Sequence, residues 1–272
     1  MRKENELKVI AVVPIFNETK TLKNILERIR PHVDMFVCVD DGSIDDSLTI
    51  LRKFASKKIN VFIVPLKKNS GMAGALKCGF LFTLFLRKNK VIQDEDIVIT
   101  IDADGQHKPE YIPEIVGYMK RKKMDVVLTR RDFSLYPTYK ILGNKFLTWT
   151  NSILSGMKYI DVESGLRFLK VKTLEPILKY YTGAKYSCAQ EIALISARSG
   201  FQIDNDFEVD IAYYRPGTTI WDGFIVLFLS FLAYGKWILK IRSQVNCDLP
   251  LLEESFIRSK KLWPKSAKRQ RK

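Results

Sequence analysis

Ile97-Val98-Ile99-Thr100-Ile101-Asp102-Ala103-Asp104-Gly105-Gln106-His107 begins as an apolar, β-branched run and ends in two acidic residues followed by a glycine. Such a run predicts a buried strand. Carboxylates at positions i and i+2 of an extended backbone point to the same side, where they repel each other unless a cation lies beside them. Mg²⁺ and Mn²⁺ bind through one or two carboxylates, and the side-chain oxygen of Gln106 offers a third ligand. The stretch therefore predicts a metal site at Asp102, Asp104 and Gln106, with a merely acidic turn as the alternative.

Predicted strands and helices alternate through the first half of the chain. Apolar runs at residues 9–13, 35–39, 61–64 and 125–129 predict further strands, and helices that end near residues 30, 57, 86 and 122 follow the first four strands in chain order. This alternation is typical of parallel βαβ units with right-handed crossovers. We therefore expect one α/β domain with a mostly parallel sheet.

Acidic side chains follow three of the predicted strands. Glu18 follows the first strand, Asp41 the second, and Asp102 and Asp104 the fourth. Because ligands of α/β sheets bind beyond the carboxyl ends of the strands, we expect these side chains to line one crevice. The carboxylate of Asp41 is suited to accept a hydrogen bond from a base or a ribose hydroxyl. The alternative for residues 40–43 is a turn that caps the next helix.

The pattern changes beyond Arg131. Helices are predicted at residues 140–154 and 188–199, a short strand at 166–171 and a strand pair within 201–214. We expect this α+β half to cover the crevice and to supply cations, which are Arg130, Arg131, Lys140, Arg167 and Arg215. Arg167 is the least compatible with a solvated surface charge, because it follows a glycine inside an apolar segment.

The formal net charge of +15 over 272 residues favours anionic partners, such as nucleic acid, phosphorylated substrates or an acidic membrane surface. Eight lysines and arginines, and no acid, follow Phe256. The rest of the chain is therefore only mildly basic. This distribution argues against nucleic acid as a partner and favours a basic tail that tethers the chain to an anionic membrane.

Residues 223–235 form the most apolar stretch, bounded by Asp222 and Lys236. A membrane span needs about 20 apolar residues, so this stretch falls short. A core helix and a helix that lies in a membrane interface both remain open. For the second, Trp221, Tyr234 and Trp237 suit the headgroup region, and Lys236, Lys240 and Arg242 suit anionic lipid.

Five motifs occur in one order along the chain. They are Pro14-Ile15-Phe16-Asn17-Glu18, Val39-Asp40-Asp41-Gly42-Ser43-Ile44-Asp45, Asn69-Ser70-Gly71, Asp102-Ala103-Asp104-Gly105-Gln106-His107-Lys108-Pro109 and Asp161-Val162-Glu163-Ser164-Gly165-Leu166-Arg167. Together they resemble the family-two glycosyltransferases, closest to the polyprenyl-phosphate sugar transferases of the dolichyl-phosphate mannose synthase type. The resemblance covers roughly residues 8 to 220. It implies a GT-A, Rossmann-like catalytic domain over residues 1–220 with helices on both faces of the sheet. A membrane-associating helix at 221–242 and a basic, flexible tail at 243–272 would follow.

The resemblance also implies roles for single residues. The nucleotide donor would be held by Pro14, Phe16, Glu18, Val39, Asp41, Asp102, Ala103, Asp104, Arg131 and Arg215. Asp104, Arg131 and Arg167 would be catalytic, and Asp102, Asp104 and Gln106 would form the metal shell. Lys140 stands where the family has an arginine that binds the acceptor phosphate. A lysine at this position offers a point charge in place of the bidentate fork of an arginine.

The activity implied is metal-dependent, inverting transfer of a sugar to a polyprenyl or dolichyl phosphate. The donor would be a nucleotide-diphosphate sugar such as GDP-mannose or UDP-glucose, with Mg²⁺ or Mn²⁺ as cofactor. Residues 1–6 lack the apolar core of a signal peptide. We therefore expect the enzyme at the cytoplasmic face of a membrane, attached peripherally or by shallow insertion.

Two other functions remain open. Family enzymes that act on sugar hydroxyls carry an acidic pair at the start of the late helix, where this chain has Gln190-Glu191. A glycosyltransferase with a glycan or other hydroxyl acceptor would use Glu191 as its base. The third possibility is a non-catalytic binding module that its tail tethers to a membrane or to nucleic acid.

Overall fold

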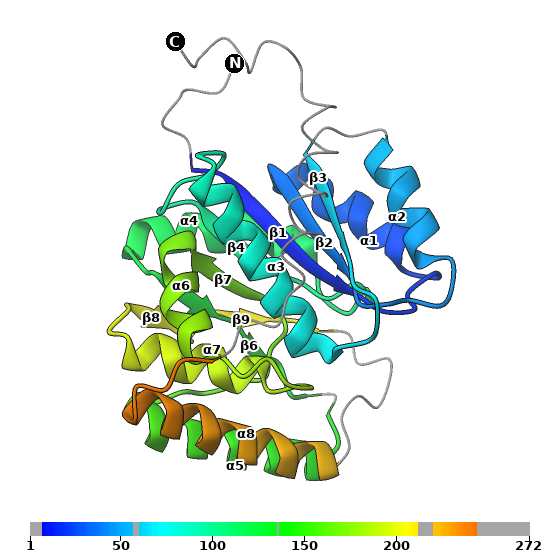
Figure 1. Cartoon of the computed structure of the whole chain (residues 1–272). Helices are drawn as coiled ribbons and strands as arrows, with labels where there is room; N and C mark the ends of the chain where they lie inside the picture. Colours follow the sequence, from blue (N-terminus) through cyan, green and yellow to red (C-terminus); the bar gives the residue numbers. More distant parts are fainter. Residues whose placement is uncertain (1–6, 57–59, 135, 212–219, 244–272) are drawn as a thin grey trace.

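The structure is a computed structural model that describes residues 7–56, 60–134, 136–211 and 220–243. Its main sheet has seven strands in the order β3-β2-β1-β4-β7-β5-β8 (Figure 1). They are β1 (Val9–Ile15), β2 (Met35–Asp40), β3 (Val61–Pro65), β4 (Ile97–Thr100), β5 (Val126–Leu128), β7 (Arg167–Lys170) and β8 (Ile203–Asp204). β7 runs antiparallel to β4 and β5, and the other pairs are parallel. The predicted mostly parallel α/β sheet is confirmed.

Helices cover both faces of this sheet (Figure 1). One face packs on α3 (Gly71–Lys88), α6 (Val171–Tyr180) and α7 (Cys188–Arg198), and the other on α1 (Leu22–Ile29), α2 (Ser47–Ser56) and α4 (Ile112–Lys122). Ile10 and Val12 of β1 belong to the first core, whereas Ala11 and Val13 belong to the second. Burial on both faces explains why the strands read as unbroken apolar runs.

A glycine in the middle of α3 allows the helix to pack closely on the sheet. A Cβ atom at Gly79 would lie 2.5 Å from Cγ1 of Val12, so the helix rests directly on β1. Only a glycine allows this approach of helix and sheet. Ser70, the residue before α3, contacts Asp41 beside the carboxyl end of β2.

One expectation for the second half was wrong, and one helix was missed. The strands within residues 201–214 do not pair with each other: β8 joins β5, and β9 (Glu208–Val209) pairs with β6 (Arg130–Arg131). Asn205 between them explains the split, because its amide donates to the carbonyls of Leu128 and Asp161, both at 2.7 Å. Helix α6 was not predicted, since Pro176 within it argues against a helix interior.

Helices α5 (Thr138–Ser155) and α8 (Ile220–Ile238) lie side by side at one end of the molecule (Figure 1). Helix α8 packs on α5 and α7 through Val226, Leu229 and Ala233, while much of its other surface is exposed. Among the described residues, the segment Trp221–Ile238 is long enough and apolar enough to cross a membrane. Helix α8 is thus a half-buried part of the body with an exposed apolar side.

Candidate functional site

The order β2-β1-β4 brings the three acidic strand ends to one edge of the sheet. The hydroxyl of Thr21 lies 2.9 Å from both Oε2 of Glu18 and the carbonyl oxygen of Ala103, so it links the loops after β1 and β4. The carboxylates of Asp104 and Glu18 also repel each other electrostatically. The loops after β1 and β4 therefore meet at this edge of the sheet.

The residues expected around the nucleotide lie along the ends of β1 and β2. Pro14 pairs with Val39 in the parallel register, and the side chain of Phe16 is 42% exposed at the edge. Asp41 is buried and accepts hydrogen bonds from the backbone N–H and the hydroxyl of Ser70, both at 2.7 Å. Asp41 thus ties the residue before α3 to the end of β2, whereas in the next helix, α2, the backbone N–H of Ser47 is bound by Asp45 at 2.9 Å.

The acidic pair comes from a turn and not from the strand itself. Strand β4 ends at Thr100, two residues before Asp102, which corrects the expected extended backbone. Asp104 accepts the backbone N–H of Gln106 at 2.9 Å, while Nε2 of His107 lies 3.3 Å from Oδ2 of Asp102. The position of each carboxylate is therefore set by the following residues of the same loop.

Gly165 is required beside this pair. A Cβ atom there would collide with Oδ2 of Asp102 and lie 2.6 Å from Nε2 of His107. Its carbonyl accepts the hydroxyl of Thr100 at 2.8 Å. The glycine of the fifth motif therefore leaves space for the carboxylate of the fourth.

The electrostatics of the pair fit a cation. Burial, together with the charges of Asp102 and Glu18, raises the pKa of Asp104. Burial opposes ionisation of Asp102, but the hydrogen bond and charge of His107 and the charge of Arg167 lower its pKa. Among the described residues, no group of three His, Cys, Asp or Glu side chains is placed to hold a metal. The oxygen atoms that the acidic loop offers in the cavity described next belong to two carboxylates and the Gln106 amide, which are ligand types that Mg²⁺ and Mn²⁺ prefer.

A cavity of about 600 Å³ joins the acidic loop to α5 and α8. Its polar lining includes Asp102, Asp104, Gln106, Arg131, Lys140, Glu163 and Arg167. Its apolar lining includes Tyr139, Phe146 and Leu147 of α5 and Phe224 and Leu227 of α8. Pro14, Phe16, Glu18, Val39 and Asp41 lie outside this lining, at the neighbouring part of the sheet edge. Charged and apolar groups therefore share one continuous space.

Arg131 is held rigidly in the wall of the cavity. Its guanidinium donates to both oxygens of Asp161, at 2.8 and 3.0 Å, and to Oδ1 of Asn144 at 2.7 Å. Its carbon CZ lies 5.1 Å from the ring centroid of Phe133. Burial opposes ionisation of Asp161, but the adjacent Arg131 lowers its pKa. The guanidinium of Arg131 therefore lines the cavity already paired and oriented.

Glu163 and Arg167 enter the same cavity from the loop before β7 and from β7 itself. Nε of Arg167 is buried and has no hydrogen-bond partner among the described residues. Glu163 accepts a hydrogen bond from Nε2 of Gln190 at 2.5 Å, and burial raises its pKa. Sequence reasoning named Arg167 but missed Glu163, whose one signal was its place inside the motif that ends at Arg167.

The remaining expected residues fall in different places. Lys140 lines the cavity from the first turn of α5. Glu191 is fully buried, is absent from the cavity lining, and accepts the backbone N–H and the hydroxyl of Thr182. Burial raises the pKa of Glu191 to about 7. Arg215 lies outside the described residues.

A sequence profile described as Glycosyl transferase family 2 matches residues 10–171, which is more than half of the chain. The chain belongs to glycosyltransferase family 2. The resemblance that its motifs carried is confirmed, and the protein is a glycosyltransferase.

Two curated relatives of this glycosyltransferase are transferases with lipid phosphates in their names. The UDP-N-acetylglucosamine–dolichyl-phosphate N-acetylglucosaminyltransferase of Methanococcus voltae is 26% identical, over 84% of this chain and 97% of the relative. The undecaprenyl-phosphate mannosyltransferase of Micrococcus luteus is 26% identical, over 74% of this chain and 77% of the relative. The family thus includes similar chains whose names specify polyprenyl-phosphate acceptors.

Solved structures show the same fold. Glucosyl-3-phosphoglycerate synthase of Mycobacterium tuberculosis in complex with UDP matches with a TM-score of 0.62 at 17% identity, over 84% of this chain and 80% of that chain. A complex of the same synthase with Mn²⁺, UDP and phosphoglyceric acid matches with a TM-score of 0.59 at 16% identity, over 85% of this chain and 78% of that chain. The expected GT-A architecture of the family-two enzyme is confirmed.

Proposed function

We propose that this family-two glycosyltransferase moves a sugar from a nucleotide-diphosphate donor to a polyprenyl phosphate, with inversion and with help from Mg²⁺ or Mn²⁺. It would work at the cytoplasmic face of a membrane. The observation that carries the proposal is the cavity of about 600 Å³, which has the acidic loop in its lining together with the apolar side chains of α5 and α8. A substrate pair with a charged reacting end and a long apolar tail fits such a space.

The donor would bind along the edge formed by the ends of β1, β2 and β4. Its nucleotide would contact Pro14, Phe16, Glu18, Val39, Asp41 and, late in the chain, Arg215. A cation held by Asp102, Asp104 and Gln106 would neutralise charge on the leaving diphosphate. The partly buried, mutually repelling carboxylates of Asp102 and Asp104 support this assignment, as does the Mn²⁺ in a structural neighbour.

Arg131 and Arg167 would stabilise the negative charge that develops on the departing diphosphate. Asp161 and Asn144 hold Arg131 in place, so no reorganisation is needed at the moment of reaction. Nε of Arg167 is buried without a partner among the described residues, which leaves this donor for a substrate oxygen. Both side chains line the cavity beside the acidic loop.

The acceptor phosphate would lie near Lys140. One of its oxygens attacks the anomeric carbon, the bond from that carbon to the donor diphosphate breaks, and the nucleoside diphosphate leaves with the electron pair. Direct displacement of this kind inverts the anomeric configuration. A phosphate is already an anion at neutral pH and needs little help from a base. The burial of Glu191 away from the cavity lining agrees with such an acceptor.

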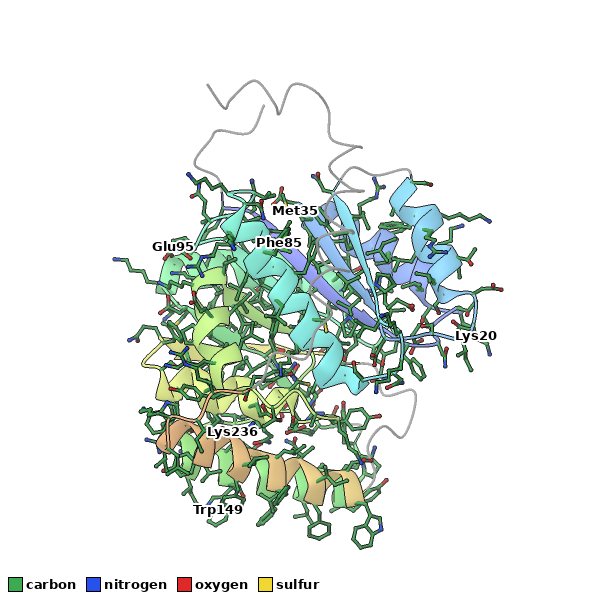
Figure 2. The ribbon with its side chains drawn as sticks, viewed as in Figure 1. Lys20, Met35, Phe85, Glu95, Trp149 and Lys236 are labelled. Atoms are coloured by element: carbon green, nitrogen blue, oxygen red, sulfur yellow. The ribbon has the colours of Figure 1, made fainter. Side chains whose placement is uncertain are left out.

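An exposed apolar surface on α5 and α8 supports a lipid-borne acceptor. Its large side chains are Tyr139, Leu142, Phe146, Trp149 and Ile153 of α5 and Trp221, Phe224, Phe228, Phe231 and Leu232 of α8. Figure 2 shows Trp149 pointing away from the body at this end. Contiguous apolar surface of this kind marks an interaction site, and membrane-interface helices present such a face with cations beside it. We call these ten side chains the apolar platform, and propose that it lies on the bilayer.

A donor screen tests the proposal. Purified enzyme would receive GDP-mannose, UDP-glucose or UDP-N-acetylglucosamine with Mg²⁺ or Mn²⁺ and a polyprenyl phosphate, and release of nucleoside diphosphate would be measured. We expect release with one donor, dependence on both cation and acceptor, and loss of nearly all turnover in Asp104→Asn. Release that ignores the cation, or that proceeds equally in Asp104→Asn, would overturn the metal assignment. Transfer to a soluble glycan but not to the lipid would overturn the acceptor.

A further inference from the structure

We infer that Glu163 hydrogen-bonds hydroxyl groups of the transferred sugar, and that Asn151 of α5 positions it through Gln190. This inference rests on the proposed function. It assigns a donor-specificity contact to a carboxylate outside the predicted metal pair, and it gives the buried side of α5 a part in substrate recognition.

A chain of buried amides leads from α5 to Glu163. Nδ2 of Asn151 donates to the side-chain oxygen of Gln190 at 2.6 Å and to its backbone carbonyl at 2.8 Å. Because the Gln190 oxygen accepts from Asn151, its amide nitrogen is turned toward Glu163, where it donates to Oε1 at 2.5 Å. Asn151 and Gln190 are almost fully buried. These bonds orient Gln190 toward Glu163, while Oδ1 of Asn151 has no hydrogen-bond partner among the described residues.

Glu163 occupies the right part of the cavity for a sugar. Among the described side chains that line this space, the acids are Asp102, Asp104 and Glu163. The first two belong to the proposed cation site, whereas the charges that act on Glu163 come from Arg131, Asp161 and Arg167. Glu163 therefore lies beside the cations proposed for the diphosphate.

The chemistry of a carboxylate selects the partner. An ionised carboxylate only accepts hydrogen bonds, so it repels the phosphates of donor and acceptor. The group that lies between those phosphates is the sugar, and its hydroxyls are donors. Gln190 engages Oε1, and no bond within the described part of the chain occupies Oε2. A hydroxyl bound to a partly buried carboxylate makes a charge-assisted hydrogen bond, which is about twice as strong as a neutral one.

Binding measurements separate this contact from a role in folding. Titration calorimetry would compare each sugar nucleotide (GDP-mannose, UDP-glucose, UDP-N-acetylglucosamine) with the matching nucleoside diphosphate, which lacks the sugar. We expect Glu163→Ala to weaken the sugar nucleotide that wild type uses by about tenfold or more, as for a hydrogen bond to a charged group. Affinity for the nucleoside diphosphate should stay within about twofold of wild type, on the same reasoning that no contact to it is lost.

Glu163→Gln is the matched variant, because its amide oxygen still accepts from Gln190 while the charge is lost. It should show a smaller loss and a changed preference among the three sugar nucleotides. For the positioning residue, Asn151→Ala should reduce the same selectivity, whereas Thr150→Ala should not. Thr150 is also a buried polar side chain of α5, but it bonds to the carbonyl of Phe146 within the helix.

Three outcomes overturn the inference. Equal losses for sugar nucleotide and nucleoside diphosphate would make Glu163 a structural residue, and unchanged affinities in both Glu163 variants would remove it from the site. Retained donor affinity with nearly complete loss of turnover in Glu163→Gln would make it a general base for a hydroxyl acceptor. If wild type binds and transfers a sugar while one of these outcomes holds, the inference alone fails. If wild type binds no sugar nucleotide, the proposed function fails with it.

Discussion

Asn144 of α5 accepts a hydrogen bond at 2.7 Å from the guanidinium of Arg131, so the helix that carries half of the apolar platform also holds a cation of the cavity. The buried residues of α5 are mostly polar: Asn144, Thr148, Thr150, Asn151, Leu154 and Ser155. Its large exposed side chains are apolar. A helix of a soluble protein usually turns its apolar stripe to the core. The inverted pattern of α5 is typical of a helix with an apolar environment outside and a polar site inside.

The first prediction concerns this bond. Asn144→Leu keeps the approximate volume but leaves a buried donor of Arg131 unsatisfied, which costs about 1–3 kcal/mol. Because Arg131 would then tilt away from the diphosphate, we expect kcat/KM to fall by roughly 10- to 100-fold. The measurement is steady-state release of nucleoside diphosphate. Lys145→Ala, an exposed change on the next residue, is the control. Equal rates in wild type and Asn144→Leu would show that Arg131 needs no anchor on α5.

The second prediction concerns the pair of Arg131 with Asp161. Asp161 is fully buried and the side chain of Arg131 is 16% exposed, so Asp161→Asn leaves a largely buried guanidinium without its counter-charge. Breaking a buried ion pair from one side costs about 3–5 kcal/mol, and we expect the free energy of unfolding to fall by that order. Urea unfolding followed by circular dichroism measures it. Asp132→Asn is the control, since Asp132 is an exposed carboxylate that bonds only locally to Ser134 among the described residues. A loss below about 1 kcal/mol, the size of a surface pair, would mean that water reaches Arg131.

Local patterns predicted the first half of the fold well. Strands β1, β2 and β4 are buried on both faces, so their apolar runs and the acidic residues that follow were visible in sequence. The insertion of β7 between β4 and β5 was not visible, because it depends on the register that pairs Thr100 with Arg167. Pairing between such distant segments leaves no periodic signal in either of them.

The same limit applies to the site. The acidic pair was visible in sequence because it follows an apolar run. The orientation of Glu163, in contrast, depends on a hydrogen bond to Gln190, 27 residues away, and that of Gln190 on a bond to Asn151, 39 residues away. The helix at 140–154 was predicted, but its exposed Phe146 and Trp149 read like core residues in sequence. Composition cannot separate an apolar face that packs inward from one that faces lipid.

The third prediction concerns pH. Burial raises the pKa of Glu191 from its ordinary 4.5 to about 7, so the folded state holds its proton more tightly than the unfolded state. Folding is therefore favoured at low pH, and this contribution is lost as the pH rises from about 4.5 to 7. One pKa unit corresponds to about 1.4 kcal/mol, so over this pH range the free energy of unfolding of the wild type should fall by roughly 3 kcal/mol relative to that of Glu191→Gln.

Urea unfolding of wild type and Glu191→Gln between pH 5 and pH 8 checks this expectation. The variant should gain stability relative to wild type as the pH rises. Glu175→Gln, which removes an exposed carboxylate of α6, should follow wild type. A constant difference across the range would show that Glu191 is ionised throughout. Turnover should also survive in Glu191→Gln, and a nearly complete loss would instead support Glu191 as a base.

The fourth prediction concerns the apolar platform. Trp149 of α5 is 60% exposed and Phe228 of α8 is 66% exposed, so glutamate at either position should leave the fold intact. On a bilayer each change would remove a buried aromatic ring, which is worth about 1.5–3 kcal/mol, and we expect vesicle binding to fall by at least tenfold. Co-sedimentation with phosphatidylcholine vesicles, with and without phosphatidylglycerol, measures it. Ile44→Glu is the control, because Ile44 is an exposed apolar residue in the loop after β2, outside the platform. If all three variants bind vesicles like wild type, the platform is not the membrane surface. The double variant Trp149→Glu and Phe228→Glu separates delivery of the acceptor from the chemistry. Normal release of nucleoside diphosphate with detergent-dispersed polyprenyl phosphate, but not with the same lipid in vesicles, would show that the platform only delivers the acceptor.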